Sequence, residues 1–276
     1  RWFRENGRDL PWRETRDPYA IWLSEIILQQ TRIAQGWEYW ERFMQTYPKV
    51  EDLAAASEDD VLKLWQGLGY YSRARNLHTA AKQIVALGAF PNTLDGIKSL
   101  KGVGDYTAAA IGSFAFDIPA AVVDGNVYRV LSRYFGIDTP INSTQGKKEF
   151  AALAQSLLPA SDAASYNQGM MDFGAIQCTP QSPKCLLCPL AETCEALRCG
   201  RVEELPVKNK TVKVKTRHLS YIYIRCKSSA ADGAGNTEPM VAIHRRGEGD
   251  IWQGLWEPYN VSDVKELPSF VKNPVL

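Results

Sequence analysis

The sequence LKGVGDYTAAAI at residues 100–111 combines a glycine turn with the start of an apolar helix. Gly102 and Gly104 flank one apolar residue, and glycine adopts the backbone angles of a tight turn without steric cost. The helix that follows begins with free N–H groups at the positive end of its dipole, where a phosphate binds favourably. The pattern therefore predicts either a phosphate-binding helical hairpin or an ordinary turn between two helices.

Helical signals extend on both sides of this hairpin, over residues 1 to about 200. Asp17 followed by Pro18 predicts a helix start, and the helical run continues over residues 19–33. Ser57 with Asp60 fits a capping box, and residues 76–87 and 107–116 have helical composition. A second Gly-apolar-Gly turn occupies residues 67–70. Alternating strand patterns are scarce here, so this region is predicted to be all-α.

Composition limits the function classes only loosely. The chain has 276 residues, 45% of them hydrophobic, and a formal net charge of +1. A near-neutral average neither supports nor excludes a nucleic-acid partner, because binding requires a basic face. No apolar run reaches the roughly 20 residues that span a bilayer. Because the chain opens at Arg1 and stops abruptly at Leu276, we expect a fragment cut at both ends.

Two carboxylates stand in unusual surroundings. Glu25 lies inside the apolar run WLSEIILQQT at residues 22–31, where desolvation would raise its pKa and let it donate a proton near neutral pH. The alternative is that Glu25 lies on the outer stripe of its helix, the side that faces solvent. Asp124 ends the apolar approach in VVDGNVYR at residues 122–129, and either caps the next helix or serves chemistry.

Four cysteines are clustered at short, fixed spacing. Cys178, Cys185, Cys188 and Cys194 follow the pattern C-x6-C-x2-C-x5-C, which suits an iron–sulfur cluster or a structural zinc ion. A disulfide framework is less suitable, because the chain is neither small nor visibly secreted. Cys199 and Cys226 are predicted to be free thiols.

The character of the sequence changes after Cys199. Residues 206–218, PVKNKTVKVKTRH, hold five Lys or Arg and no acid, so we predict a basic linker over residues 201–218 that is either a solvated tether or a phosphate contact. Residues 219–225 and 240–244 are strand-like, with a small-residue loop at residues 228–237 between them. A second, β-containing domain is therefore predicted at residues 219–276, and it is incomplete.

Taken together, the hairpin, the downstream Asp124 and the cysteine spacing resemble the endonuclease III and MutY superfamily of DNA glycosylases. The resemblance implies that residues 1–200 form a helix-hairpin-helix glycosylase region, with two helical subdomains and DNA in the cleft between them. It also implies a [4Fe–4S] cluster in the loop at residues 178–194. The predicted cluster ligands are Cys178, Cys185, Cys188 and Cys194.

Within this superfamily the sequence is similar to the MutY branch. Endonuclease III has a Schiff-base lysine two residues after the second hairpin glycine, where this chain has Tyr106. Residues 24–31, 67–77 and 167–172 resemble MutY segments. The resemblance implies a monofunctional enzyme of base excision repair that hydrolytically removes adenine mispaired with 8-oxoguanine or guanine. The alternatives are a glycosylase-lyase for oxidised pyrimidines and a non-catalytic iron–sulfur DNA-binding module.

The resemblance also assigns roles to individual residues. Glu25 matches the proton donor to adenine N7, and Asp124 matches the carboxylate that stabilises or traps the sugar cation. Tyr106 and Asn126 match the polar groups that support this pair. Residues predicted to contact substrate or DNA are Trp12, Arg13 and Gln168 around the adenine, Gln30 and Tyr70 in the gap it leaves, Leu68 and Thr31 near 8-oxoguanine, and Gly102 and Gly104 in the hairpin. Just before the hairpin glycine, this chain has Lys101 where many members of the family have proline or another residue. Lysine is a conservative change in a phosphate-binding turn, so the predicted hairpin stands.

The C-terminal residues 219–276 resemble the start of a MutT-like, Nudix-fold α/β domain. They lack the hydrolase signature of active Nudix enzymes, so 8-oxoguanine recognition is expected. The expected partner is double-stranded DNA, bound by a monomer without membrane association. The expected location is the cytoplasm of a bacterium, or the nucleus or mitochondrion of a eukaryote. We expect structural roles for His78, His218 and His244, and core positions for Trp37, Trp40 and Trp65.

Overall fold

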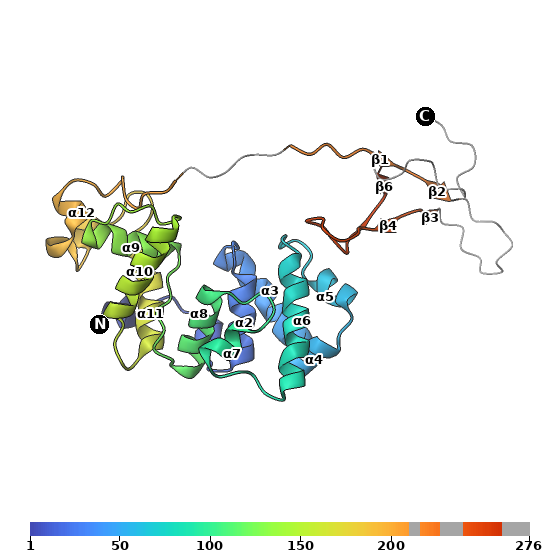
Figure 1. The fold of residues 1–276 in the computed structure, drawn as a ribbon, viewed down its shortest axis with the longest axis horizontal. Coiled ribbons are helices and arrows are strands. Elements are labelled where there is room, and N and C mark those ends of the chain that lie inside the picture. Colours follow the sequence, from blue (N-terminus) through green and yellow to red (C-terminus); the bar gives the residue numbers. More distant parts are fainter. Residues whose placement is uncertain (210–215, 227–239, 261–276) are drawn as a thin grey trace. The chain divides into compact units, whose positions relative to one another are not determined.

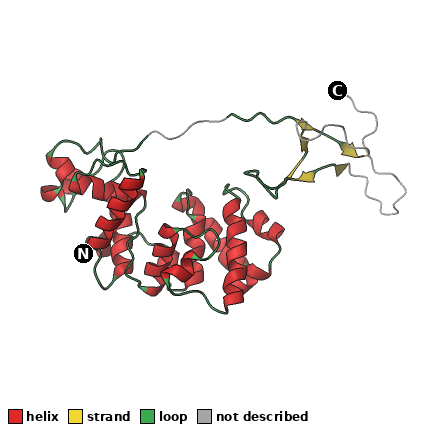
Figure 2. Cartoon of the chain, viewed as in Figure 1, coloured by secondary structure: helices red, strands yellow, loops and turns green. Residues whose placement is uncertain are grey.

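The computed structural model describes residues 1–209, 216–226 and 240–260. Its contacts divide the chain into two compact units, one made of residues 1–69 and 73–211 and the other of residues 70–72 and 212–276. Helices fill the first unit, whereas the described strands all lie between residues 221 and 260 (Figure 2). The prediction of an all-helical region over residues 1–200 is confirmed.

Helices of varied length, joined by turns and longer loops, make up the helical region (Figure 1). The α-helices are α1 (Trp2–Asn6), α2 (Pro18–Ile27), α3 (Ile33–Thr46), α4 (Val50–Ala55), α5 (Glu58–Leu64), α6 (Ser72–Leu87), α7 (Leu94–Lys98), α8 (Asp105–Phe116), α9 (Gly125–Phe135), α10 (Thr144–Leu157), α11 (Ala163–Asp172) and α12 (Glu195–Arg198). Shorter or wider turns are η1 (Pro11–Arg13), η2 (Phe173–Gln177), η3 (Cys185–Leu187) and η4 (Ala191–Thr193).

The predicted helix starts are confirmed by their caps. The side chain of Asp17 accepts a hydrogen bond from the backbone N–H of Tyr19, and the hydroxyl of Ser57 accepts one from that of Asp60. Capping of this kind satisfies backbone donors that have no partner within the helix. These interactions fix where α2 and α5 begin.

The predicted continuation of the first helix to Ile33 is wrong. Helix α2 ends at Ile27, and Gln30 adopts a left-handed backbone conformation with φ of 55° before α3 begins at Ile33. The guanidinium of Arg73 donates to the carbonyls of Ile26 and Ile27, which have left the helical hydrogen-bond pattern. A partner distant in sequence thus ends a helix that local propensity would continue.

Helix α2 is the centre of one core. Nine of its ten residues are buried, and it packs along α8, so an apolar helix is covered on all sides. Trp65 is fully buried nearby, and His78 is buried with its Nε2 3.0 Å from the carbonyl oxygen of Ala56. The expected core position of Trp65 and the structural role of His78 are confirmed.

A second core lies between α9 and α10. Its buried members are Val127, Leu131, Ile141, Phe150 and Ala154. Helix α9 also contacts α11 and α12, and these elements lie beside one another in Figure 1. Helix α11 contacts α8 as well, and thereby joins the two cores.

Residues 201–209, which the sequence analysis assigned to the linker, pack on the helical unit. Leu205 is buried, and its carbonyl accepts a hydrogen bond from Nε of Arg133. The carbonyl of Val207 accepts one from the backbone of Ile141. Asn209 forms a reciprocal pair of hydrogen bonds with Asn142.

The described C-terminal residues form three antiparallel strand pairs. The strands are β1 (Tyr221–Ile222) with β6 (Tyr259–Asn260), β2 (Arg225–Cys226) with β3 (Met240–Val241), and β4 (His244–Arg245) with β5 (Trp256–Glu257). Each expected strand run is therefore divided into two short pieces, and the predicted loop at residues 228–237 lies outside the described residues. None of the helices in the described parts of the chain has the length and apolar content needed to cross a bilayer.

Candidate active site and cysteine loop

Glu25 lies near the C-terminal end of α2 and lines a pocket whose space, counted with the solvent at its mouth, is about 440 Å³. Only 8% of the residue is exposed. Burial raises the pKa of Glu25 from 4.5 to about 7, although a hydrogen bond from Tyr106 opposes part of the rise. The negative charge of Asp124 adds to the increase, and Arg13 opposes it. The outer-stripe alternative for Glu25 is therefore wrong, and the carboxyl can hold a proton near neutral pH.

Tyr106 donates the hydrogen bond that Glu25 receives. It lies in the first turn of α8, directly after the glycine hairpin. Burial, together with the negative charges of Glu25 and Asp124, raises the pKa of Tyr106 well above its usual value. The phenol therefore stays protonated and keeps its role as a donor.

Asp124 caps α9 and also interacts with the Glu25 site. Its Oδ1 accepts from the backbone of Asn126 at 2.9 Å and of Val127 at 2.8 Å, and its Oδ2 accepts from Nδ2 of Asn126 at 2.7 Å. The same charge raises the pKa of both Glu25 and Tyr106, so the three groups lie within electrostatic range. Asp124 can therefore cap α9 and also lie near Glu25.

The pocket gathers residues that are far apart in the sequence. Trp12, Arg13 and Gln168, all predicted to surround an adenine, line it together with Glu25. The ring of Trp12 packs edge-on against Trp37 and Trp40, which places these tryptophans in the packing around the pocket. The remaining lining residues are Arg8, Leu10, Ile21, Ser24, Leu28, Ile33, Phe114 and Met171.

Sequence reasoning missed the ion pairs at one side of this pocket. Asp172 is completely buried. Arg8 donates three hydrogen bonds to its carboxylate, two at 2.8 Å from the backbone nitrogen and Nε and one at 2.5 Å from Nη2, and Arg13 donates two at 2.8 Å from its guanidinium. Burial alone would raise the pKa of Asp172, but the bonds from Arg13 and Arg8 outweigh it and lower the pKa. Because 164 residues separate Arg8 from Asp172, no local pattern could reveal the pairing.

The predicted DNA-contacting residues lie on three turns. Gln30 and Tyr70 are exposed and have left-handed backbones, with φ of 55° and 47°. Thr31 is partly buried, and Leu68 is buried, so the side chain of Leu68 belongs to the packed interior. At the hairpin, Gly102 has φ of 78°, whereas Gly104 has an extended backbone and caps α8.

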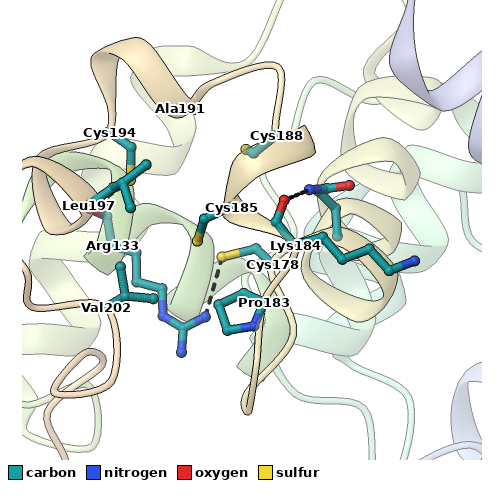
Figure 3. A pocket seen from close by; sticks show the side chains of 11 residues that line it. Arg133, Cys178, Pro183, Lys184, Cys185, Cys188, Ala191, Cys194, Leu197 and Val202 are labelled. Carbon is teal, nitrogen blue, oxygen red and sulfur yellow. Dashed lines mark hydrogen bonds between the residues drawn. The ribbon is translucent and has the colours of Figure 1, made fainter.

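The four clustered cysteines line a separate pocket with about 330 Å³ of empty space (Figure 3). Arg133 reaches the sulfur of Cys178 at 3.5 Å and also donates to the carbonyls of Thr179 and Pro180. Among the described residues, no three His, Cys, Asp or Glu side chains are close enough to hold a single metal ion. A tetrahedral zinc site needs sulfurs about 2.3 Å from one ion. The four thiols surround one shared space and could together hold an iron–sulfur cluster.

Two cysteines, Cys199 and Cys226, lie outside the cluster pattern. Cys199 is an exposed free thiol next to the carboxylate of Glu195, as expected. The side chain of Cys226 lies outside the described residues.

Arg129 connects the start of α9 to the cysteine loop. Its Nη2 donates to the side-chain oxygen of Asn126 at 2.8 Å, and its Nε donates to the carbonyl of Cys178 at 2.7 Å. A chain of hydrogen bonds therefore runs from Asp124 through Asn126 and Arg129 to the first cysteine.

Two family models match the chain. Residues 23–159 match the HhH-GPD superfamily of base excision DNA repair proteins, and residues 178–194 match the iron-sulfur binding domain of endonuclease III. The second match begins at Cys178 and ends at Cys194. The [4Fe–4S] cofactor expected from the resemblance is confirmed.

Several curated relatives are adenine DNA glycosylases. The protein of Mus musculus is 43% identical over 219 residues, which make up 74% of this chain and 42% of the mouse protein. The protein of Buchnera aphidicola from Acyrthosiphon pisum is 39% identical over 211 residues, which make up 75% of this chain and 60% of that protein. That of Buchnera aphidicola from Schizaphis graminum is 33% identical over 278 residues, with 99% of this chain and 77% of the relative covered. The chain thus spans about half the length of some relatives and about three quarters of another.

Solved structures of DNA glycosylases share the fold of the helical region. A thermostable thymine-DNA glycosylase has a TM-score of 0.67 and 34% identity, covering 72% of this chain and 92% of that one. Endonuclease III bound to DNA has a TM-score of 0.62 at 24% identity, which shows a shared fold. The predicted resemblance is confirmed. The chain belongs to the HhH-GPD superfamily of base excision DNA repair proteins, and within it to the MutY-type adenine DNA glycosylases.

Proposed function

We propose that this chain is the catalytic part of an adenine DNA glycosylase that hydrolyses the bond between adenine and its deoxyribose in mispaired DNA. The observation that carries the proposal is the buried carboxyl of Glu25, whose pKa of about 7 suits a general acid. The relatives named adenine DNA glycosylase support the choice of base. The product is an abasic site, because no second bond in the DNA backbone is cut.

The proposed reaction divides two roles between two acids. Glu25 transfers its proton to adenine N7, so the base leaves as a neutral molecule with the electrons of the glycosidic bond. Asp124 stabilises the positive charge that remains on the sugar, or bonds to it briefly, until water adds at the sugar carbon and gives up a proton, which the Glu25 carboxylate can take back. Paired carboxyls with separated pKa values serve this purpose in other glycosidases. Tyr106 orients Glu25, and Asn126 holds Asp124.

The target adenine must leave the duplex before it can meet a buried acid. Trp12, Arg13 and Gln168 would contact the extruded base, since they line the pocket that contains Glu25. Gln30 and Tyr70 would fill the space left in the DNA, and Thr31 would lie near the opposite base. Because the side chain of Leu68 is buried, only its backbone would come near that base. Gly102 and Gly104 would bring the hairpin close to a phosphate.

Cys178, Cys185, Cys188 and Cys194 would hold the [4Fe–4S] cluster, which supplies a covalent cross-link for a loop with little regular structure. Arg133 would place a buried positive charge beside the thiolates. This role is structural, and the excision chemistry depends on the residues around Glu25.

We further propose that the substrate is double-stranded DNA with adenine opposite 8-oxoguanine or guanine. Residues 219–276 would begin a Nudix-like domain that recognises 8-oxoguanine, joined by the basic linker. The chain would act as a monomer wherever the cell keeps its DNA, in the bacterial cytoplasm or in a eukaryotic nucleus or mitochondrion. The lyase alternative is less suitable, because Tyr106 offers no amine and no lysine lines the described Glu25 pocket.

The direct test is a single-turnover assay on a duplex with adenine opposite 8-oxoguanine, with alkali to cleave abasic sites. The wild-type chain should release adenine, and the rate should fall as pH rises through about 7, because the acid form of Glu25 disappears. Glu25→Gln should lose at least about a hundredfold in rate while keeping duplex binding. Unchanged turnover by Glu25→Gln would remove this residue from the mechanism.

A further inference from the structure

Arg73, on the first turn of α6, binds the backbone of two separate turns at once. Its Nη1 lies 3.0 Å from the carbonyl oxygens of Ile26 and Ile27 and 2.5 Å from that of Gln29. Its Nη2 donates to the carbonyls of Leu68 at 3.4 Å and Gly69 at 3.3 Å. One guanidinium therefore joins the end of α2 to the turn that precedes α6.

Each of these turns carries a residue in a costly conformation. Gln30 directly follows the Gln29 carbonyl, and Tyr70 directly follows the Gly69 carbonyl. Both have positive φ, which is uncommon for residues other than glycine and is strained for a bulky tyrosine. Such conformations persist only where surrounding contacts enforce them. Arg73 supplies contacts of this kind on both sides.

The turn at residues 66–69 is held by side chains at every carbonyl. Tyr39 donates to Gln66 at 2.6 Å, and Gln35 donates to Gly67 at 3.4 Å. Arg73 donates to Leu68, and the carbonyl of Gly69 accepts from both Arg73 and Trp65. The guanidinium also lies 5.0 Å from the ring centre of Trp65, which orients its plane. Arg73 is the one donor in this set that also reaches the other turn.

We propose that Arg73 is the positioning residue that fixes the Gln30 turn and the Tyr70 turn as a preformed pair, so that both enter the DNA together when adenine is extruded. This inference rests on the proposed function. It assigns to Arg73 the extrusion step and leaves proton transfer to Glu25. Preformed geometry lowers the cost of ordering these turns at the moment of binding.

The planar fork of arginine is essential to this role. Its five N–H donors spread over several acceptors, whereas lysine presents one compact ammonium on a flexible stem. In Arg73→Lys the positive charge remains near the end of α2, where it stabilises the helix dipole. One ammonium cannot span both turns, so Arg73→Lys should lose the coupling between them.

The experiment separates extrusion from binding and chemistry. A duplex carries 2-aminopurine, a fluorescent adenine analogue that brightens on unstacking, opposite 8-oxoguanine. With wild-type chain, fluorescence should rise on mixing. With Arg73→Lys, the rate of that rise and the single-turnover excision rate should both fall about tenfold or more, while duplex affinity changes less than about threefold. The control Arg42→Lys, an exposed arginine over the ring of Tyr39, should behave as wild type.

The possible results test the role of Arg73 separately from the proposed glycosylase function. Equal fluorescence and excision rates in Arg73→Lys and wild type would overturn the inference, because the turns would then not depend on the guanidinium. If Arg73→Lys does not fold, Arg73→Gln replaces it, since its single short amide cannot span both turns. A fall in the fluorescence rate relative to wild type supports the inference, and no change refutes it. Failure of wild type to excise adenine would instead refute the proposed function.

Discussion

At the scale of single residues, the properties of Glu25 come from its position within the α2 core. A carboxyl on the surface of a helix would be ionised at neutral pH, but here burial raises the pKa to about 7. Tyr106 offsets part of that increase by donating a hydrogen bond. The balance keeps a sizeable fraction of Glu25 protonated near neutrality. The same burial also makes ionisation of Glu25 costly for the folded state.

This cost predicts how stability changes with pH. Well below pH 4.5 the carboxyl is protonated in both the folded and the unfolded chain, so its ionisation adds no pH dependence to the free energy of unfolding. Between 4.5 and about 7 the unfolded chain ionises first, so stability falls with rising pH, by about 3 kcal/mol in total. Glu25→Gln should therefore be more stable than wild type at about pH 8, with the difference shrinking toward about pH 5. Denaturant melts at both pH values measure this, and equal differences at the two would contradict it.

At the scale of elements, the hairpin between α7 and α8 shows two glycines with different tasks. Gly102 has a left-handed backbone, and an added Cβ would come within 2.7 Å of the Cβ of Asn76 on α6. Gly104 has an extended backbone, and an added Cβ would meet nothing within 4 Å. Packing therefore requires Gly102, whereas Gly104 leaves open space at the start of α8.

Alanine substitutions should separate these tasks. Gly102→Ala should destabilise the fold by about 1–2 kcal/mol, because alanine is strained at this φ and crowds Asn76. Gly104→Ala should leave the melting temperature nearly unchanged but weaken duplex binding, since a methyl group would stand where a phosphate approaches. Thermal melts and binding titrations at one fixed salt concentration test both. A melting temperature lowered equally by both substitutions would show that Gly104 also serves packing.

At the scale of the whole molecule, the helical unit includes more chain than its helices. Leu205 is buried, and its carbonyl satisfies Arg133, which in turn contacts the cysteine loop. The segment at residues 201–209 is thus part of the support for this loop. The described strand pairs belong to the second unit.

Truncations should locate this boundary. A chain ending after residue 211 should keep its visible iron–sulfur absorbance and excise adenine, because the first unit is intact. A chain ending after Glu203 should melt at least about 5 °C lower, since it loses a buried leucine and the acceptor for Arg133. If the second unit reads 8-oxoguanine, the shorter chains should also lose preference for 8-oxoguanine over guanine. Equal melting temperatures for the two truncations would show that residues 204–211 add no stability.

The sequence by itself determined the helical class, the starts of α2 and α5, the glycine hairpin and the cysteine loop. These features depend on neighbouring residues, because caps, turns and short cysteine spacings are local. The raised pKa of Glu25 was also predictable in direction, since an acid within an apolar helix becomes desolvated.

Only the tertiary structure decided where α2 ends and which distant groups meet. Arg73 ends that helix from 44–47 residues away, and Arg8 pairs with Asp172 across 164 residues. The docking of Leu205 on Arg133 likewise joins segments 72 residues apart. Such contacts form when the chain packs and leave no periodic signal in the sequence. For that reason the proposed roles of Glu25 and Arg73 both depend on partners that folding brings to them.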